Sequence, residues 1–219
     1  MFVSFEGLDG SGKTTQIDRL EQRLRARGCA VTRVREPGGT EIGERVRALL
    51  LDPDIDIAPR AELLLFAAAR AHLCETVVRP ALGRGEVVLA DRFFDSTTAY
   101  QMGGRGVLPP SPPPGPQVPG LSVRAEAFHR YVTGDLVPAR TFLLRLDPDD
   151  ALARRAGRGA DRMEASSDAF FRRVAAAYDA VASASPARVR VFDATEPPGA
   201  LADAIWADLA PRLGLAPEI

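Results

Sequence analysis

The sequence predicts an α/β protein with a parallel sheet, and two observations carry the prediction. Short apolar runs that suit buried strands recur along the chain, and helical patterns fill the intervals between them. A glycine-rich segment, residues 7–15, stands between the first apolar run and the first helical pattern. Such alternation requires right-handed crossovers with helices on both faces, so we expect a three-layer α/β/α arrangement.

The individual elements can be placed in order along the chain. Five strands are expected, at residues 2–5, 30–35, 87–90, 141–146 and 189–192. Helices are expected at residues 13–27, 41–51, 59–83, 149–155, 167–182 and 198–213. Gly28 is expected to cap the end of the first helix, and Thr40 to cap the start of the second. The third helix is apolar nearly all round between residues 63 and 69, which predicts that much of it is buried.

The composition indicates one globular domain over residues 1–219. The chain is 46% hydrophobic and 26% charged, and its formal net charge is −1. No general basic field therefore points to nucleic acid or to a membrane surface as a partner. No apolar run reaches the length of a membrane span, and the two cysteines lack metal or redox spacing. We therefore expect a cytoplasmic protein.

The glycine-rich segment matches the phosphate-binding pattern Gly-x-x-x-x-Gly-Lys-[Ser/Thr], in the strand-to-helix context that the pattern requires. Its glycines let successive N–H groups point inward, and the following helix adds partial positive charge. Lys13 can reach the outer phosphates of a nucleoside triphosphate, and the Thr14 hydroxyl can ligate Mg²⁺. The expected nucleotide site comprises Gly7, Leu8, Asp9, Gly10, Ser11, Gly12, Lys13 and Thr14.

Lys13 is the only lysine among the 28 basic residues of the chain. The other basic residues, apart from histidine, are all arginines. A compact ammonium fits among phosphate oxygens as a point charge, where the wide guanidinium fork fits poorly. The location of the lone lysine therefore supports the phosphate-binding interpretation.

Further charged residues follow predicted strands. Glu36, Asp91 and Arg92 lie just beyond strand ends, and ligands of parallel sheets bind at the carboxyl edge. Arg92, directly after a buried strand, suits the binding of an anionic group at this edge. Asp91 can orient Arg92 or belong to a Mg²⁺ shell. Phe66 and Arg70, four residues apart, share one face of the third helix.

Seven segments together resemble those of bacterial thymidylate kinases, within the P-loop nucleoside-monophosphate kinases. They occur in order over nearly the full length, at residues 5–15, 35–40, 47–51, 65–70, 91–93, 99–101 and 158–164. The resemblance implies a homodimeric enzyme that transfers the γ-phosphoryl group of ATP to dTMP, giving dTDP, with Mg²⁺. The first segment is the phosphate-binding loop, which would hold ATP.

The resemblance also implies an acceptor site. Arg92 would bind the acceptor phosphate, Phe66 would stack on thymine, and Arg70 would reach the exocyclic oxygen of the base. Tyr100 would exclude a ribose 2′-hydroxyl, and Asp9 would lie near the sugar 3′-hydroxyl. Other positions that match the acceptor site are Glu36, Arg47, Ser96, Thr97 and Gln101.

Residues 154–165 contain several arginines separated by glycines. This pattern predicts a short arginine-rich lid that closes on phosphates. The phosphate-binding loop has no arginine at its variable positions, so we expect the cation at the transferred phosphoryl group to come from this lid. The expected catalytic residues are Lys13, Arg92, Arg158 and Arg162.

The sequence leaves other interpretations open. Residues 109–120 include seven prolines and predict an exposed polyproline-II insertion. A GTPase is disfavoured, because its guanine-recognition motif needs a second lysine. Another P-loop kinase, acting on a nucleoside or small metabolite, remains an alternative. So does a non-catalytic nucleotide-binding protein that docks a partner through the proline-rich segment.

Overall fold

The computed structural model describes residues 1–108, 121–155 and 162–215. Its strands form one parallel sheet in the order β2-β3-β1-β4-β5. They are β1 (Phe2–Glu6), β2 (Val31–Arg35), β3 (Val87–Asp91), β4 (Arg140–Arg145) and β5 (Val189–Asp193). The predicted five-stranded parallel sheet is confirmed, and each predicted strand overlaps the observed one almost completely.

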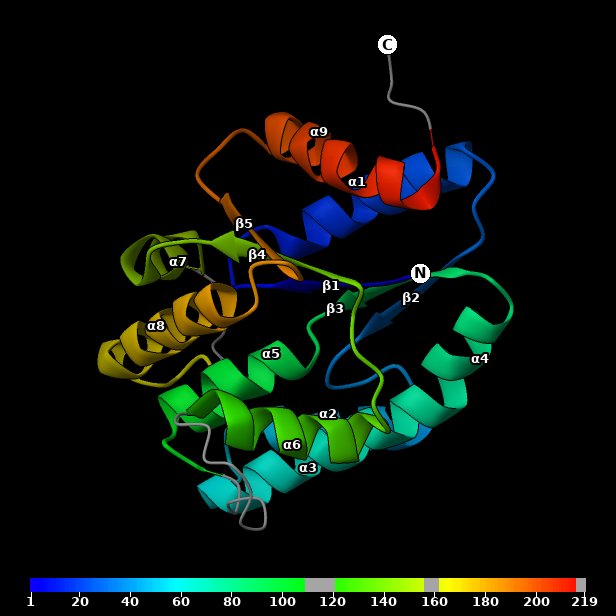
Figure 1. Cartoon of the computed structure of the whole chain (residues 1–219). Coiled ribbons are helices and arrows are strands. Elements are labelled where there is room, and N and C mark those ends of the chain that lie inside the picture. Colours follow the sequence, from blue (N-terminus) through cyan, green and yellow to red (C-terminus); the bar gives the residue numbers. More distant parts are fainter. Residues whose placement is uncertain (109–120, 156–161, 216–219) are drawn as a thin grey trace.

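Helices cover both faces of the sheet (Figure 1). On one side lie α1 (Lys13–Ala26) and α9 (Pro198–Leu209), the latter followed by the 3₁₀ turn η3 (Ala210–Leu213). On the other side lie α4 (Arg79–Gly83), α5 (Phe94–Thr97) and α8 (Asp168–Ala184). Farther from the sheet on this second side are α2 (Glu41–Leu51), α3 (Pro59–Leu73) and α6 (Leu121–Thr133). The predicted three-layer arrangement is confirmed.

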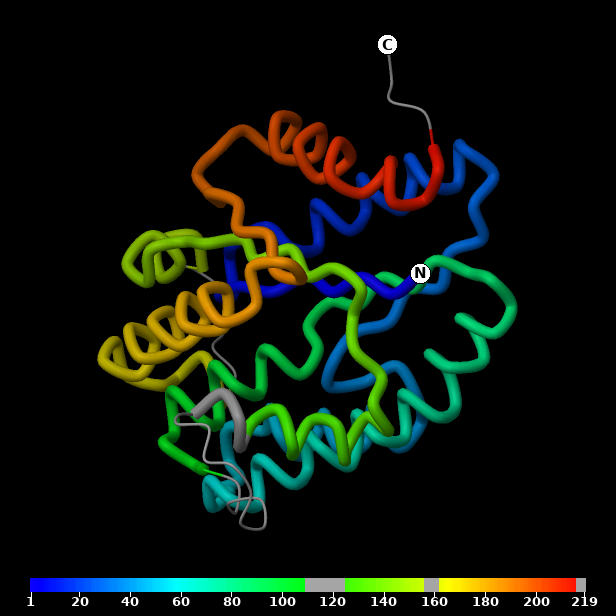
Figure 2. Tube along the Cα trace, viewed as in Figure 1, coloured from blue at the N-terminus to red at the C-terminus, as the bar shows by residue number. Residues whose placement is uncertain are grey.

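Segments distant in sequence meet in the second helical layer. The tube in Figure 2 shows α3 and α6 running side by side, and the two helices contact each other. The helix α7 (Pro148–Arg155) follows β4 at the carboxyl edge of the sheet. The acceptor-side residues predicted from the sequence are carried by this layer and by the loops at that edge.

The predicted helix at 59–83 is observed with one irregularity. A π-helical segment, η1 (Cys74–Val78), separates α3 from α4. Pro80 has no amide hydrogen to donate to the carbonyl of Thr76, so the regular ladder is interrupted there. The prediction of burial was wrong at Leu64, which is 55% exposed. An apolar run therefore did not imply burial on every side of α3.

Three helical segments were not assigned from the sequence: α5, α6 and the π-helical segment η2 (Thr98–Gly104). The glycines at the end of η2 allow it to pack closely on α8. A Cβ atom on Gly103 would lie 2.4 Å from the Cβ of Ala177, and one on Gly104 would lie 2.5 Å from the Phe170 ring. This approach places Tyr100 and Gln101, the preceding residues of η2, beside the carboxyl edge of the sheet.

Two predicted helix caps are confirmed. Gly28 follows α1 with φ of 77°, a left-handed conformation that favours glycine. The Thr40 hydroxyl accepts a hydrogen bond of 2.9 Å from the amide of Gly43 at the start of α2. Within the described ranges, no helix is both long enough and apolar enough to cross a membrane.

Candidate active site

The glycine-rich loop joins β1 to α1, as predicted. Gly7, Gly10 and Gly12 all have positive φ, at 136°, 88° and 88°. Gly7 also approaches β4 closely, because a Cβ atom there would lie 2.4 Å from the carbonyl oxygen of Leu144. Side chains at these positions would be strained or would clash, so the loop conformation depends on glycine.

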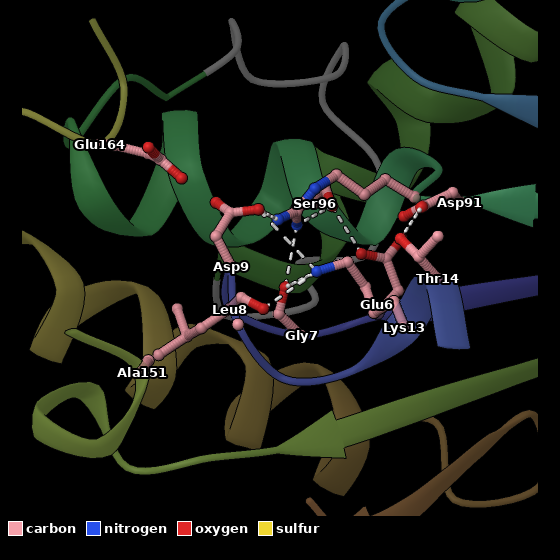
Figure 3. Close-up of polar contacts among 12 residues, drawn as sticks. Glu6, Gly7, Leu8, Asp9, Lys13, Thr14, Asp91, Ser96, Ala151 and Glu164 are labelled. Atoms are coloured by element: carbon pink, nitrogen blue, oxygen red, sulfur yellow. Dashed lines mark hydrogen bonds and ion pairs between the residues drawn. The ribbon is translucent and has the colours of Figure 1, made fainter. Parts of the chain in front are cut away.

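The lone lysine lies inside the loop (Figure 3). Its Nζ donates hydrogen bonds to the carbonyl oxygens of Gly7, at 3.1 Å, and Leu8, at 2.9 Å. Burial, together with the charge of Arg92, lowers the pKa of Lys13 to about 8. The ammonium is therefore positioned at the loop, where it can neutralise phosphate oxygens.

Thr14 and Asp91 meet beside the loop. The Thr14 hydroxyl donates to the Asp91 carboxylate over 3.2 Å, and both side chains line the cavity in front of the loop. Hydroxyl and carboxylate oxygens are hard ligands of the kind that Mg²⁺ prefers. The pair fits the predicted metal position.

Arg92 is held in place by several contacts. Its backbone has φ of 71°, an uncommon conformation for a residue other than glycine. Its guanidinium forms an ion pair of 2.6 Å with Asp9 and donates to the Gly7 carbonyl over 2.9 Å. It also donates to the hydroxyls of Ser96 and Tyr178, each over 3.2 Å. These contacts hold one guanidinium directly against the phosphate-binding loop.

The Asp9 carboxylate is held in its charged form. Burial opposes ionisation, but the charges of Arg92 and Lys13 lower the pKa of Asp9 well below its usual range. Tyr100 donates to the same carboxylate over 3.4 Å, and burial raises the pKa of this phenol. Asp9 therefore links the loop with Arg92 and with Tyr100 of η2.

All the residues predicted for the acceptor site line one cavity of about 90 Å³. Pro37, Leu51 and Met163, which the sequence analysis did not single out, complete its walls. The predicted residues that the cavity brings together are Asp9, Glu36, Arg47, Phe66, Arg70, Arg92, Ser96, Thr97, Tyr100 and Gln101.

A second cavity, of about 460 Å³, opens in front of the phosphate-binding loop. Gly10, Gly12, Lys13, Thr14 and Asp91 contribute to its walls, which are mainly polar. The two cavities adjoin, because four residues line both of them: Asp9, Glu36, Arg47 and Arg92. An anion in each cavity would thus face a shared wall that contains two arginines.

Comparisons with known proteins identify the family of the chain. A family model described as thymidylate kinase matches residues 5–110 and 122–205. The chain belongs to the thymidylate kinase family. The thymidylate kinase of Deinococcus radiodurans is 48% identical over 214 residues, covering 97% of each chain. That of Chlorobium chlorochromatii is 41% identical over 230 residues, covering 98% of this chain and 96% of the relative.

A solved structure supports the same fold. The crystal structure of thymidylate kinase from Ehrlichia chaffeensis matches with a TM-score of 0.67 and 31% identity, covering 88% of this chain and 91% of that one. The resemblance to thymidylate kinases seen in the sequence is confirmed. The individual roles that it implies for site residues stay predictions.

Arg70 is more enclosed than its predicted contact with a base suggests. It is 1% exposed, and its guanidinium forms an ion pair of 2.5 Å with the buried Glu36. It also donates to the Thr97 hydroxyl over 2.8 Å and to the Phe93 carbonyl over 3.2 Å. Phe93 is buried against Phe2 and beneath this guanidinium.

The predicted lid arginines are only partly described. Arg158 lies outside the described residues, as does the proline-rich segment at 109–120. The structure does not bring Arg162 to the phosphate-binding loop. Its guanidinium donates to the buried Glu62 carboxylate over 2.7 Å and to the Leu50 carbonyl over 2.8 Å. A role for Arg162 at the transferred phosphoryl group stays a prediction that would require its release from Glu62.

Glu6 and Tyr178 belong to the site but were not predicted. The Glu6 carboxylate accepts hydrogen bonds from the Ser96 hydroxyl at 2.5 Å, the Tyr178 hydroxyl at 2.9 Å and the Phe93 amide at 2.8 Å. Two of these donors, Ser96 and Tyr178, also contact Arg92. An acid directly after the mainly apolar predicted strand 2–5 is the signal that could have identified Glu6.

The buried Glu6 carboxylate yields a prediction about stability and pH. Burial and the charge of Asp95 raise the pKa of Glu6 from 4.5 to about 7. Between these values the folded state binds more protons than the unfolded state, so this group makes the free energy of unfolding fall as pH rises. Glu6→Gln should therefore lose less stability than the wild type between pH 5 and pH 8, as measured by urea unfolding.

Glu44→Gln is the matched control. A hydrogen bond from the Gly39 amide lowers the pKa of Glu44. The contribution of Glu44 to the free energy of unfolding therefore changes below pH 4.5, outside the tested interval. Its effect on stability should thus be similar at pH 5 and pH 8. An identical pH dependence for wild type and Glu6→Gln would contradict the titration assigned to Glu6.

Proposed function

We propose that the chain transfers the γ-phosphoryl group of ATP to dTMP, giving dTDP. The observation that carries the proposal is the pair of adjoining cavities, one at the phosphate-binding loop and one lined by every predicted acceptor residue. Phosphoryl transfer depends mainly on positioning two anionic groups and neutralising their charge. Arg92 and Arg47 stand on the wall that the two cavities share.

Lys13 and the loop amides would hold the ATP phosphates. Thr14 and Asp91 would hold Mg²⁺, which would supply positive charge to neutralise the phosphates. In the described part of the chain, no group of three or more His, Cys, Asp or Glu side chains could hold a metal ion alone. That fits Mg²⁺, which usually takes one or two protein ligands and completes its shell with phosphates and water.

The acceptor cavity favours a phosphorylated nucleotide. Arg92 would bind the acceptor phosphate, with Asp9 and Tyr100 next to the sugar. Phe66 would supply the flat surface for thymine. A nucleoside acceptor would offer no phosphate group to the Arg92 guanidinium on the cavity wall, which supports dTMP over the nucleoside-kinase alternative.

We also propose that the enzyme is a homodimer that pairs through α2 and α3. Ile42 and Leu49 are seven residues apart on one face of α2 and are 49% and 46% exposed. Leu64, on the neighbouring α3, is 55% exposed. Exposed apolar side chains grouped on neighbouring helices favour burial against a second copy.

Leu64→Arg should convert the dimer into a monomer, because two like charges would then be buried at the interface. Light scattering after size exclusion should give about twice 23.5 kDa for the wild type and 23.5 kDa for the variant. Leu152→Arg, at a similarly exposed position on α7, should remain dimeric. A monomeric wild type, or a dimeric Leu64→Arg variant, would refute this interface.

The proposed reaction predicts dTMP-dependent release of ADP, with thymidine much poorer as an acceptor. Arg92→Ala should lower kcat/KM for dTMP at least about a hundredfold, on the scale of losing a preorganised charge contact. A coupled ADP-release assay with ATP and Mg²⁺ measures both. Arg172→Ala, which removes an exposed arginine paired with Asp149, should retain wild-type kinetics.

Equal turnover of thymidine and dTMP would indicate a nucleoside kinase. Tight ATP binding without any acceptor-dependent turnover would indicate a non-catalytic nucleotide-binding protein. Wild-type kinetics for Arg92→Ala would show that the acceptor phosphate is held by other residues.

A further inference from the structure

A buried carboxylate stands behind the acceptor cavity. Glu62, on α3, is fully buried and does not line the cavity itself. One of its oxygens accepts hydrogen bonds from the Gln101 amide at 2.9 Å and from the Arg105 guanidinium at 3.4 Å. The other accepts from Arg162 at 2.7 Å. The two arginines balance its charge, so the carboxylate is firmly held.

The contact with Glu62 determines which way the Gln101 amide points. A primary amide carries a donor NH₂ group and an acceptor oxygen, whereas a carboxylate only accepts. The Gln101 NH₂ group must therefore face Glu62, and the amide oxygen must face the other way. Gln101 lines the acceptor cavity, and within the described residues its amide oxygen accepts no hydrogen bond.

A hydrogen-bond donor lies near Gln101 on the cavity wall. Arg70 lines the same cavity and donates to the Thr97 hydroxyl, one helical turn before Gln101. The Gln101 amide oxygen, an acceptor, and the Arg70 guanidinium, a donor, thus lie on the same wall of the cavity. The N3–H and O4 of thymine complement that pattern, whereas the bare N3 and the 4-amino group of cytosine present it reversed.

We propose that Glu62 is a specificity-determining positioning residue, which makes the acceptor cavity select pyrimidines that carry N3–H. It acts through Gln101 by holding the amide oxygen toward the base. This inference rests on the proposed function, since it assumes that a nucleobase occupies the cavity. The selection follows because a mismatched base would leave buried polar groups unpaired on both sides.

The terminal torsion of glutamine is broad and nearly two-fold, so an amide without a fixed partner can turn over. In Glu62→Gln the new side chain could offer Gln101 either its oxygen or its NH₂ group. The Gln101 amide could then present its own NH₂ group to the base, matching the N3 atom of cytosine. Discrimination between the two bases should fall while the shape of the cavity is kept.

The test compares dTMP with 5-methyl-dCMP as acceptors. The two share the methyl group, sugar and phosphate and differ only at the N3–C4 edge. Glu62→Gln should lower the ratio of kcat/KM for dTMP to that for 5-methyl-dCMP at least about tenfold. Loss of folded enzyme alone cannot produce this result, because an inactive fraction cancels in the ratio.

Arg105→Gln is the matched control, because Arg105 contacts Glu62 but not Gln101. In Arg105→Gln the ratio of kcat/KM for dTMP to that for 5-methyl-dCMP should stay within about twofold of the wild-type ratio. Glu62→Asp is a second variant that keeps the charge for Arg162 but withdraws the carboxylate from Gln101, and it should also lower the ratio. In a Gln101→Leu background, Glu62→Gln should leave the ratio unchanged, because the residue through which it acts is absent.

An unchanged ratio in Glu62→Gln and Glu62→Asp would overturn the inference. An equal fall in Arg105→Gln would overturn it too, because the effect would then come from general repacking. Wild-type enzyme without dTMP-dependent ADP release would refute the proposed function, and the inference with it, before any variant is compared.

Discussion

The ion pair between Asp9 and Arg92 is the interaction on which the site depends. The parallel register of β1 with β3 places Phe5 opposite Asp91, so the residues that follow each strand meet at the carboxyl edge. Arg92 adopts a left-handed backbone conformation, which costs about 1–3 kcal/mol and persists only where surrounding contacts compensate. Its contacts with Asp9, Gly7, Ser96 and Tyr178 supply that compensation. The pair thereby joins the phosphate-binding loop to the acceptor cavity.

Buried charges organise the rest of the acceptor side. Glu36 with Arg70 and Glu62 with Arg162 are ion pairs whose carboxylates are nearly or fully buried. Such pairs are poor sources of stability, because desolvation offsets most of the attraction. Their consequence here is positional: the polar groups that would meet a nucleotide are fixed before it binds. Preorganisation of this kind suits phosphoryl transfer, where little covalent chemistry is required of the protein.

Much of the fold was predictable because its signals are local. The apolar strands and the glycine-rich loop specify the parallel sheet and the edge where ligands bind, and the acceptor residues matched by resemblance do meet in one cavity. The segment 94–104 was not predicted, because it relies on the close packing of Gly103 and Gly104 against α8. The partners of Glu6, Glu62 and Arg162 were not predictable either. Each hydrogen bond joins residues far apart in sequence, and no periodicity records such a pairing.

In the proposed reaction two anions bind face to face, with Arg92 between them. A crystal structure with dTMP, ADP and Mg²⁺ tests it most directly. The dTMP phosphate should lie within hydrogen-bonding distance of the Arg92 guanidinium, and the ADP β-phosphate should lie at the loop amides and Lys13. A dTMP phosphate bound away from Arg92, with that guanidinium still contacting only protein groups, would contradict it.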